Sequence, residues 1–285
     1  PFRFHVPGKA ASFQNQVVVT QIQTTGLSDR LNCEKLQIFF SERSAPGSDK
    51  TSIAGPPARK TSALSLQPQR LEATGTPVVL VAPSRSAYAR GSRLEYDLLA
   101  NRVLLEDSKE AVLQQDRNEI HSPSIRYESP DPKRFGTIDA AGPGWLRWQM
   151  AERPGQELKA YWNKRLVVQP DQQNQVISLT GGAGLKAAAL GQKAAALGQL
   201  DASEIHLWFT QMRAQAPSDR FELRPDKMRA LGNVRIAAPQ LSGAVEQLDV
   251  WFEQKDGKTI PRWKIGAPAE GAAKKDSGTE KPEGD

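Results

Sequence analysis

Short runs in which apolar and polar residues alternate recur along the whole chain. In residues 204–209 (EIHLWF), Ile205, Leu207 and Phe209 occupy every second position. Side chains two apart on a strand point to the same face, so this pattern predicts a strand with one apolar face. Comparable runs predict strands at residues 16–22, 36–40, 77–82, 102–105, 111–114, 165–169, 176–179, 233–236 and 247–252.

The spacing of these runs indicates an all-β protein. The runs are separated by clusters of Gly, Pro, Asn, Asp and Ser, and the chain holds 22 Gly and 20 Pro in 285 residues. Short strands at intervals of about 8–12 residues are typical of sandwiches, barrels or stacked β architectures. The alternation of strands and helices that a doubly wound enzyme fold needs does not appear.

A degenerate repeat links several of the predicted strands. Its template is a small residue, then Leu or Ile three positions later, then an apolar or aromatic residue two positions after that. Copies lie at 31–40, 89–98, 120–129, 200–209 and 241–252, and the small positions are Cys33, Gly91, Ser122 and Ala202, with Val245 as a departure in the last copy. A small residue there suits a bend or a close approach of a neighbouring sheet. One copy cannot bury its apolar face alone, so the copies should stack and share an interior.

A second phrase accompanies this repeat. Residues 71–80 (LEATGTPVVL) and 228–236 (MRALGNVRI) both place Ala and Gly before an alternating strand. Together the two phrases form an ordered set across residues 71–128, LEATGTPVVLVAPSRSAYARGSRLEYDLLANRVLLEDSKEAVLQQDRNEIHSPSIRYE. Weaker versions of this set occur at 17–40 and 228–252. This ordered set resembles the OstA-like family of lipopolysaccharide-transport proteins, which includes the periplasmic bridge protein LptA and the N-terminal domain of the outer-membrane translocon LptD.

The resemblance implies an elongated, stacked antiparallel β-jellyroll, a folded sheet open along one side and lined with apolar side chains. It implies a non-enzymatic envelope protein that binds the acyl chains of a lipopolysaccharide-like lipid, as a periplasmic bridge or scaffold. Further OstA-like domains would join through open sheet edges. The candidate groove residues are Val17, Val19, Leu36, Ile38, Phe40, Leu94, Tyr96, Ile125, Tyr127, Ile205, Leu207, Phe209, Leu248, Val250 and Phe252. The same residues would also suit an ordinary packed interior, and the sequence leaves both readings open.

Three segments interrupt the strand pattern. Residues 44–61 predict a long loop, and residues 267–285, which lack large apolar residues, predict a disordered tail. Residues 183–200 contain the unit KAAALGQ twice in tandem. They predict a loop excursion, with a short helix near 185–199 if it packs on the sheet. We expect two OstA-like regions, 1–142 and 143–266, stacked on one another.

The net charge of +6 admits anionic partners but does not select one. Trp145, Trp148 and Trp162 lie among basic residues, a pattern that can stack bases or sugars. This supports an alternative hypothesis, a basic aromatic module for polyanions such as nucleic acid or acidic glycan. The lipid hypothesis expects no nucleic-acid partner, and strands that merely cover a sheet surface would give the same pattern.

Signals for catalysis are weak. His5, His121 and His206 are scattered, and neither a metal-ligand spacing nor a nucleophile elbow nor a phosphate-binding loop occurs. A polysaccharide lyase on a stacked β scaffold would need matched chemistry at equivalent outward positions. Those positions differ widely here: Gln37, Glu95, Arg126, His206 and Asp249. We therefore expect no enzyme, cofactor or metal.

The single cysteine, Cys33, gives no disulfide signature, and no apolar run approaches the roughly 20 residues of a membrane-spanning helix. No signal peptide precedes the first strand-like run, so a leader for the expected periplasmic or outer-membrane-associated location would lie outside these residues.

Overall fold

The computed structural model describes residues 2–5, 8–22, 26–42, 66–129, 136–149, 156–172, 174–189, 196–213, 221–238, 241–255 and 258–265. Almost all of these residues are strand. The strands are β1 Phe2–His5, β2 Ala10–Ile22, β3 Ser28–Glu42, β4 Leu66–Ala82, β5 Ala87–Asp97, β6 Arg102–Gln115, β7 Asn118–Glu128, β8 Thr137–Ala141, β9 Gly144–Gln149, β10 Gln156–Trp162, β11 Arg165–Asp171, β12 Asn174–Ala189, β13 Ala196–Arg213, β14 Phe221–Ala238, β15 Leu241–Lys255 and β16 Lys258–Ile265, with one 3-10 turn at Pro83–Arg85. The predicted all-β, elongated antiparallel architecture is confirmed.

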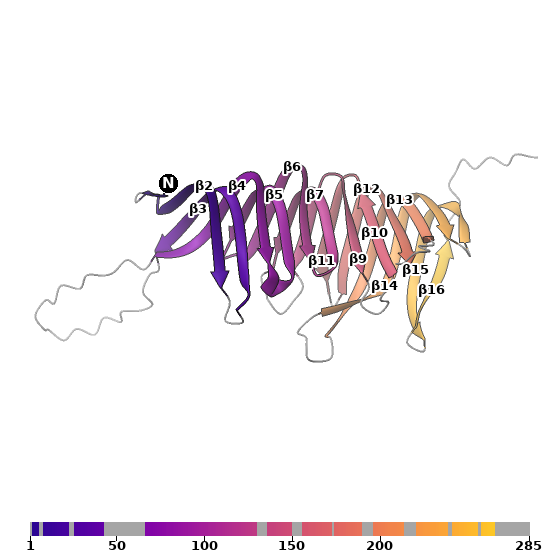
Figure 1. The fold of residues 1–285 in the computed structure, drawn as a ribbon. Helices are drawn as coiled ribbons and strands as arrows, with labels where there is room; N and C mark the ends of the chain where they lie inside the picture. Colours follow the sequence, from indigo (N-terminus) through magenta and orange to yellow (C-terminus); the bar gives the residue numbers. More distant parts are fainter. Residues whose placement is uncertain are drawn as a thin grey trace, which may run out of the picture.

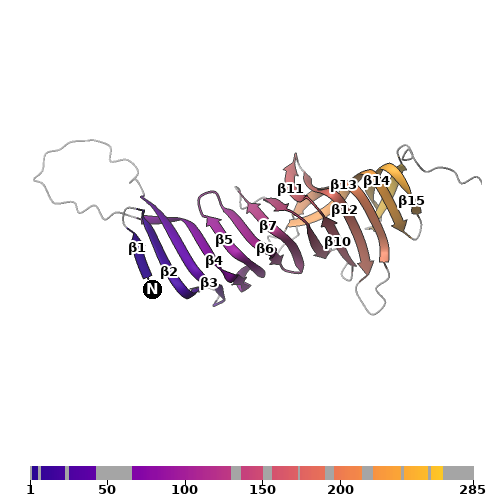
Figure 2. The ribbon, with the colours of Figure 1, turned by 90° about the horizontal axis from the view of Figure 1, so that it is seen from above.

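All strands belong to one 16-stranded antiparallel sheet, and most of them pair with their neighbours in the sequence. Figure 1 shows the strands side by side across a long body, with β2 near one end and β16 at the other. Figure 2 shows the same succession from above. Because most pairings join strands that are consecutive in the sequence, the order of the strands in the sheet largely follows the chain.

The long strands are each divided in two by an irregularity in their pairing. The register shifts between β3 and β4 at Asn32/Lys35, between β5 and β6 at Arg90/Arg93, and between β13 and β14 at Asp201/Glu204. In the middle of the sheet two pairs of short strands replace single long ones, because β7 pairs with both β8 and β9, and β12 pairs with both β10 and β11. These shifts and breaks follow one another along the sheet, and we call this row the fold line.

The fold line divides the sheet into two leaves. The first leaf contains β1, β8, β11, β16 and residues 10–14, 35–42, 66–74, 93–97, 102–106, 124–128, 174–180, 204–213, 221–231 and 247–255. The second leaf contains β9, β10 and residues 17–22, 28–33, 78–82, 87–90, 111–115, 118–122, 183–189, 196–202, 234–238 and 241–245. Trp148 of the second leaf and Phe209 of the first have ring centroids 5.1 Å apart. The two leaves therefore face one another across a shared apolar interior.

The small residues of the sequence repeat lie at the fold line. Cys33, Ser122 and Ala202 are buried there, and a Cβ built on Gly91 would lie 2.7 Å from the backbone oxygen of Glu106. Larger side chains would hold the two leaves apart at this point. The repeat thus marks where each strand bends, as its small position predicted.

Left-handed backbone also concentrates at the fold line. Gly181 and Gly182 have φ of 84° and 89°, and Gly232 and Asn233 have φ of 72° and 52°. These values favour Gly and, less strongly, Asn. The GG and GN pairs in the sequence therefore place sharp bends within β12 and β14.

Most of the predicted short strands are each one half of a bent strand, whereas 165–169 lies in the short strand β11. Residues 102–105 and 111–114, which the sequence separates, are the two halves of β6 on either side of the fold line. The polar residues between them suggested a loop. They instead form the bend, and pairing resumes beyond it.

The predicted excursion at the tandem repeat is wrong for the residues that the structure describes. Residues 186–189 end β12 and pair with β10, and residues 196–199 begin β13. Backbone pairing on neighbouring strands outweighs the helix propensity of the alanines. Residues 190–195, the predicted loop at 44–61 and the predicted tail at 267–285 lie outside the described residues.

The sheet continues across the predicted region boundary at 142/143. Gly142, with φ of 90°, separates β8 from β9, and both strands pair with β7. Among the described residues, no helix has the length and apolar character needed to cross a bilayer.

Gly91→Ala tests the fold line. The added Cβ would meet backbone rather than a flexible side chain, so we expect a loss of about 1–3 kcal/mol in the free energy of unfolding. Gly243→Ala is the control, because a Cβ there meets nothing within 4 Å. Its expected effect is within about 0.5 kcal/mol. Equal urea midpoints for the two variants would contradict a tightly closed fold line.

Candidate functional site

The interior between the leaves collects most of the predicted groove residues. A single apolar cluster runs through the molecule, and its partly buried margin includes Val17, Ile38, Tyr127 and Phe252. Its buried members from the predicted set are Leu36, Leu94, Ile125, Ile205, Leu207, Phe209, Leu248 and Val250. Three predicted residues, Val19, Phe40 and Tyr96, lie outside this cluster, and the Tyr96 hydroxyl donates to Asn101 Oδ1 at 3.2 Å. Alternation of side chains therefore did bring residues from many strands to one surface.

The predicted groove residues line chiefly one wall of this interior. Thirteen of its fifteen candidates belong to the first leaf, and only Val17 and Val19 lie on the second. The second leaf also contributes Val78, Ala111, Leu146, Trp162, Leu185, Leu200, Val234 and Ile236. Several of these lie in alanine-rich or aromatic segments that did not match the repeat. Their period-two spacing within strands was the available signal.

Burial decreases from the fold line towards the free margin of the first leaf. On β15, Leu248 and Val250 are fully buried, whereas Phe252 is only partly buried. On β3 the same order holds, with Leu36 buried and Ile38 and Phe40 half-buried. On these strands the inner side chains are thus fully buried beside the bend and partly exposed at the opposite margin.

The interior is most exposed at the N-terminal end. Phe2 and Phe4 of β1 are 61% and 42% exposed, and Val19 is 40% exposed. Phe2 contacts Phe13 and Phe4 contacts Phe40, with ring centroids 5.0 and 6.2 Å apart. The Phe-x-Phe alternation of β1 precedes the first predicted strand and was missed. These aromatic residues leave apolar surface in contact with water at this end.

The tryptophan segment does not form the aromatic and basic surface that the sequence suggested. Trp148 and Trp162 face the interior, and Trp162 is 1% exposed. Trp145 stacks on His121, at a centroid distance of 3.8 Å. Arg147 is ion-paired with Glu119 at 3.0 Å. Two of the three aromatic rings therefore lie on the face opposite the basic side chains, where they cannot act together.

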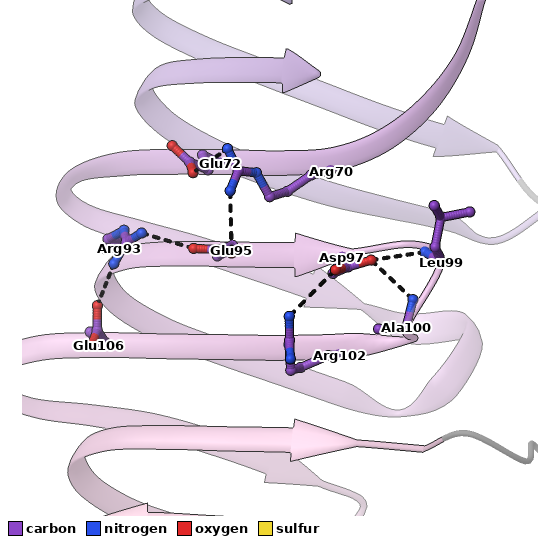
Figure 3. A network of polar contacts seen from close by, with 9 residues as sticks. All are labelled: Arg70, Glu72, Arg93, Glu95, Asp97, Leu99, Ala100, Arg102 and Glu106. Carbon is purple, nitrogen blue, oxygen red and sulfur yellow. Dashed lines mark hydrogen bonds and ion pairs between the residues drawn. The ribbon is translucent and has the colours of Figure 1, made fainter. Parts of the chain in front are cut away.

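The outer face of the first leaf carries a ladder of ion pairs (Figure 3). Arg93 contacts Glu95 and Glu106, each at 2.8 Å, and thereby joins β5 to β6. Arg70 contacts Glu72 at 3.3 Å and Glu95 at 3.9 Å, which extends the ladder to β4. Cross-strand pairs of opposite charge support one register. The same ladder keeps this part of the outer face polar, whereas the inner face of the same strands is apolar.

A turn-forming carboxylate continues the ladder. Asp97 accepts hydrogen bonds from the backbone N–H groups of Leu99 and Ala100, each at 3.0 Å, and is 3.4 Å from Arg102 (Figure 3). The carboxylate satisfies amides that the tight β5–β6 connection leaves unpaired. It holds the two strands in register at the free margin of the leaf.

Hydrogen-bond partners lower the pKa of two aspartates on the outer face. The hydrogen bond from Arg165, at 2.6–2.7 Å, lowers the pKa of Asp139. Burial by itself would raise the pKa of Asp249, but hydrogen bonds from Arg229 and Gln247, both at 2.7 Å, outweigh it and the pKa is lowered. Both carboxylates are therefore charged wherever the fold is intact at neutral pH.

The chemistry available in the interior is that of apolar binding. Its walls are aliphatic and aromatic, and its fold-line cysteine, Cys33, has a pKa raised by burial, which disfavours the reactive thiolate. Within the described ranges, no three His, Cys, Asp or Glu side chains gather as a metal ion would require. His206, on the outer face, has its Nδ1 2.9 Å from Ser178 Oγ.

Acid titration tests the outer-face carboxylates. A pKa below the ordinary value of 3.8 means that Asp249 stabilises the fold above that value and loses this contribution as the pH falls through the folded-state pKa. We expect Asp249→Asn to be less stable than the parent at pH 7, with the difference shrinking between about pH 5 and pH 2. Denaturant midpoints measured across this range provide the check.

The control is Glu246→Gln, which removes an exposed carboxylate from the same strand. A difference between Asp249→Asn and the parent that stays constant down to pH 2, or that appears equally for Glu246→Gln, would contradict the assigned role.

Comparison with known proteins agrees with this geometry. Residues 4–133 match the family described as LptA/(LptD N-terminal domain) LPS transport protein. No match was found among curated proteins or among solved structures. The match spans β1 to β7 and contains the ordered phrases at 71–128, which confirms the resemblance predicted from them. Residues 4–133, somewhat less than half of the chain, are therefore similar to the LptA/LptD N-terminal family, which is described as serving in lipopolysaccharide transport.

Proposed function

We propose that this protein is a non-enzymatic envelope protein that holds the acyl chains of a lipopolysaccharide-like lipid between the two leaves of its sheet. The observation that carries the proposal is the accessible apolar surface on the inner face of β1 to β3, most of which lies within the matched residues 4–133. Phe2, Phe4 and Val19 expose apolar side chains there. An apolar ligand that covers these side chains would stabilise the folded protein.

The energetics favour a chain-like ligand at this end. Each buried methylene contributes about 0.8 kcal/mol, so that several carbon atoms of an acyl chain already outweigh the cost of ordering it. Aromatic and β-branched side chains line the inner margin, rather than polar groups. Such a surface accepts alkyl chains without leaving hydrogen-bonding groups unpaired.

We further propose that residues 143–266 form a second OstA-like region stacked on the first, residues 1–142. The same pairing irregularities recur there, at Thr180/Ala183, Asp201/Glu204 and Leu231/Val234. The interior also continues from one region to the next as a single cluster. A lipid path along both regions would suit a periplasmic bridge or scaffold.

The partners that fit this proposal are lipopolysaccharide and other OstA-like domains. β1 and β16 are the outermost strands of the sheet, and an outermost strand offers backbone groups to a partner strand. The expected location is the periplasm or the periplasmic side of the outer membrane.

Photo-crosslinking from two adjacent phenylalanines tests the lipid site. Phe40 lies beside Phe4 on the inner margin, whereas Phe39 lies under Arg70, whose guanidinium carbon is 4.3 Å from the ring centroid, on the outer face. Replacing each in turn by benzoyl-phenylalanine makes the same chemical change on opposite faces. Purified lipopolysaccharide should crosslink at position 40 and not at position 39. Crosslinking of equal yield at both positions, or only at position 39, would sink the proposal.

A further inference from the structure

A concave site at the edge formed by β1 to β3 is lined mainly by outer-face side chains, together with Ala10 and Phe4. It has a volume of about 570 Å³, and its polar lining residues are Arg3, His5, Ser12, Gln14, Lys35 and Gln37. Arg3, Ser12 and Gln37 lie in one row across the three strands, and Gln14 and Lys35 lie opposite one another in the next row. The register of the sheet therefore brings all six side chains to one side of the edge.

Among the residues that the structure describes, no carboxylate lines this concavity, whereas two of its side chains, Arg3 and Lys35, are cationic. Carboxylates elsewhere on β3 and β4 contact other groups. Glu34 accepts a hydrogen bond from the Thr76 hydroxyl at 2.9 Å. Glu42 is ion-paired with Lys9 at 2.9 Å, and Glu72 with Arg70 at 3.3 Å.

This contrasts with the ladder a few strands away. There each arginine meets a carboxylate of a neighbouring strand, as Arg93 meets Glu106 at 2.8 Å. The alternation of charges stops at β3, and the last cations of the row face the concavity. A bound anion that is not part of the protein would supply the negative charge that faces these cations.

The neutral groups of the site are hydrogen-bond donors. His5 Nδ1 accepts a hydrogen bond from the Gly8 backbone N–H at 3.1 Å, so that the neutral ring carries its proton on Nε2. Ser12 supplies a hydroxyl, and the amides of Gln14 and Gln37 supply N–H groups. Two cations and several donors at one concavity match a group with three acceptor oxygens and up to two negative charges.

We propose that this concavity binds a phosphoryl group, either as a free phosphorylated ligand or as the phosphomonoester headgroup of a lipid. Arg3 and Lys35 neutralise its charge, and Ser12, Gln37 and His5 donate to its oxygens. Phe4 lines both this concavity and the apolar margin, whereas the cationic and donor side chains belong to the outer face, so that phosphoryl binding does not require acyl chains between the leaves.

Calorimetric titration of the whole chain with inorganic phosphate tests the site, with acetate as the comparison anion. We expect phosphate to bind more tightly than acetate, and Arg3→Gln/Lys35→Gln to weaken phosphate binding tenfold or more, because each lost contact is a charge-assisted hydrogen bond. Arg85→Gln/Lys109→Gln removes the same charge from exposed positions outside the concavity, in the turn after β4 and at the bend of β6. This control should bind phosphate as the parent does.

The second arm identifies the source of the phosphoryl group. Phosphatidylcholine vesicles are prepared with and without phosphatidic acid, and sedimentation is measured with and without free phosphate. Binding only to vesicles with phosphatidic acid, and its reversal by phosphate, assigns a lipid headgroup; phosphate binding without vesicle binding assigns a free ligand.

Two results would overturn the proposal. One is that neither phosphate nor the acidic vesicles bind. The other is that the two double variants weaken binding equally, which would reduce the effect to overall charge.

Discussion

Every strand that crosses the molecule has to bend at its middle while its pairing continues on both sides of the bend. This requirement is met at the fold line, where the backbones and the two leaves approach most closely. Gly91 shows how little room remains, since an added Cβ would lie 2.7 Å from a neighbouring backbone oxygen. The interior, the direction of its free margin and the division of the surface into two faces all depend on this row of bends.

The bend gives the two faces of the sheet different chemistry. Inside, side chains from both leaves meet, and burial is complete at Ile205 and Leu248 beside the fold line. Outside, the intervening positions hold charges, as in the contacts of Arg93 with Glu95 and Glu106. A charged outer face prevents the sheet from burying itself on both sides. The apolar surface of the interior is consequently accessible at the free margin and at the N-terminal end.

The ends of the sheet differ because the succession of strands begins and stops. In the middle of the sheet, bulky contacts such as that between Trp148 and Phe209 fill the space between the leaves. At the N-terminal part, Phe2 and Phe4 have fewer strands around them and stay exposed. The outer ladder likewise ends there, with Arg3 and Lys35 facing a concavity instead of a carboxylate. One structural fact, the end of the sheet, thus produces both an apolar and a cationic surface.

The sequence by itself determined the strands, their apolar faces, the small residues at the bends and the similarity of residues 4–133 to a lipopolysaccharide-transport family. These are local properties, because side-chain alternation and the absence of a bulky Cβ act within a few residues. Only the tertiary structure decided that separate short runs such as 102–105 and 111–114 are one bent strand, and that the alanine-rich residues 186–189 pair with β10. It also decided that Trp148 and Trp162 face inward. Each of these depends on which distant strand lies alongside, and pairing between strands outweighs local preference wherever the two disagree.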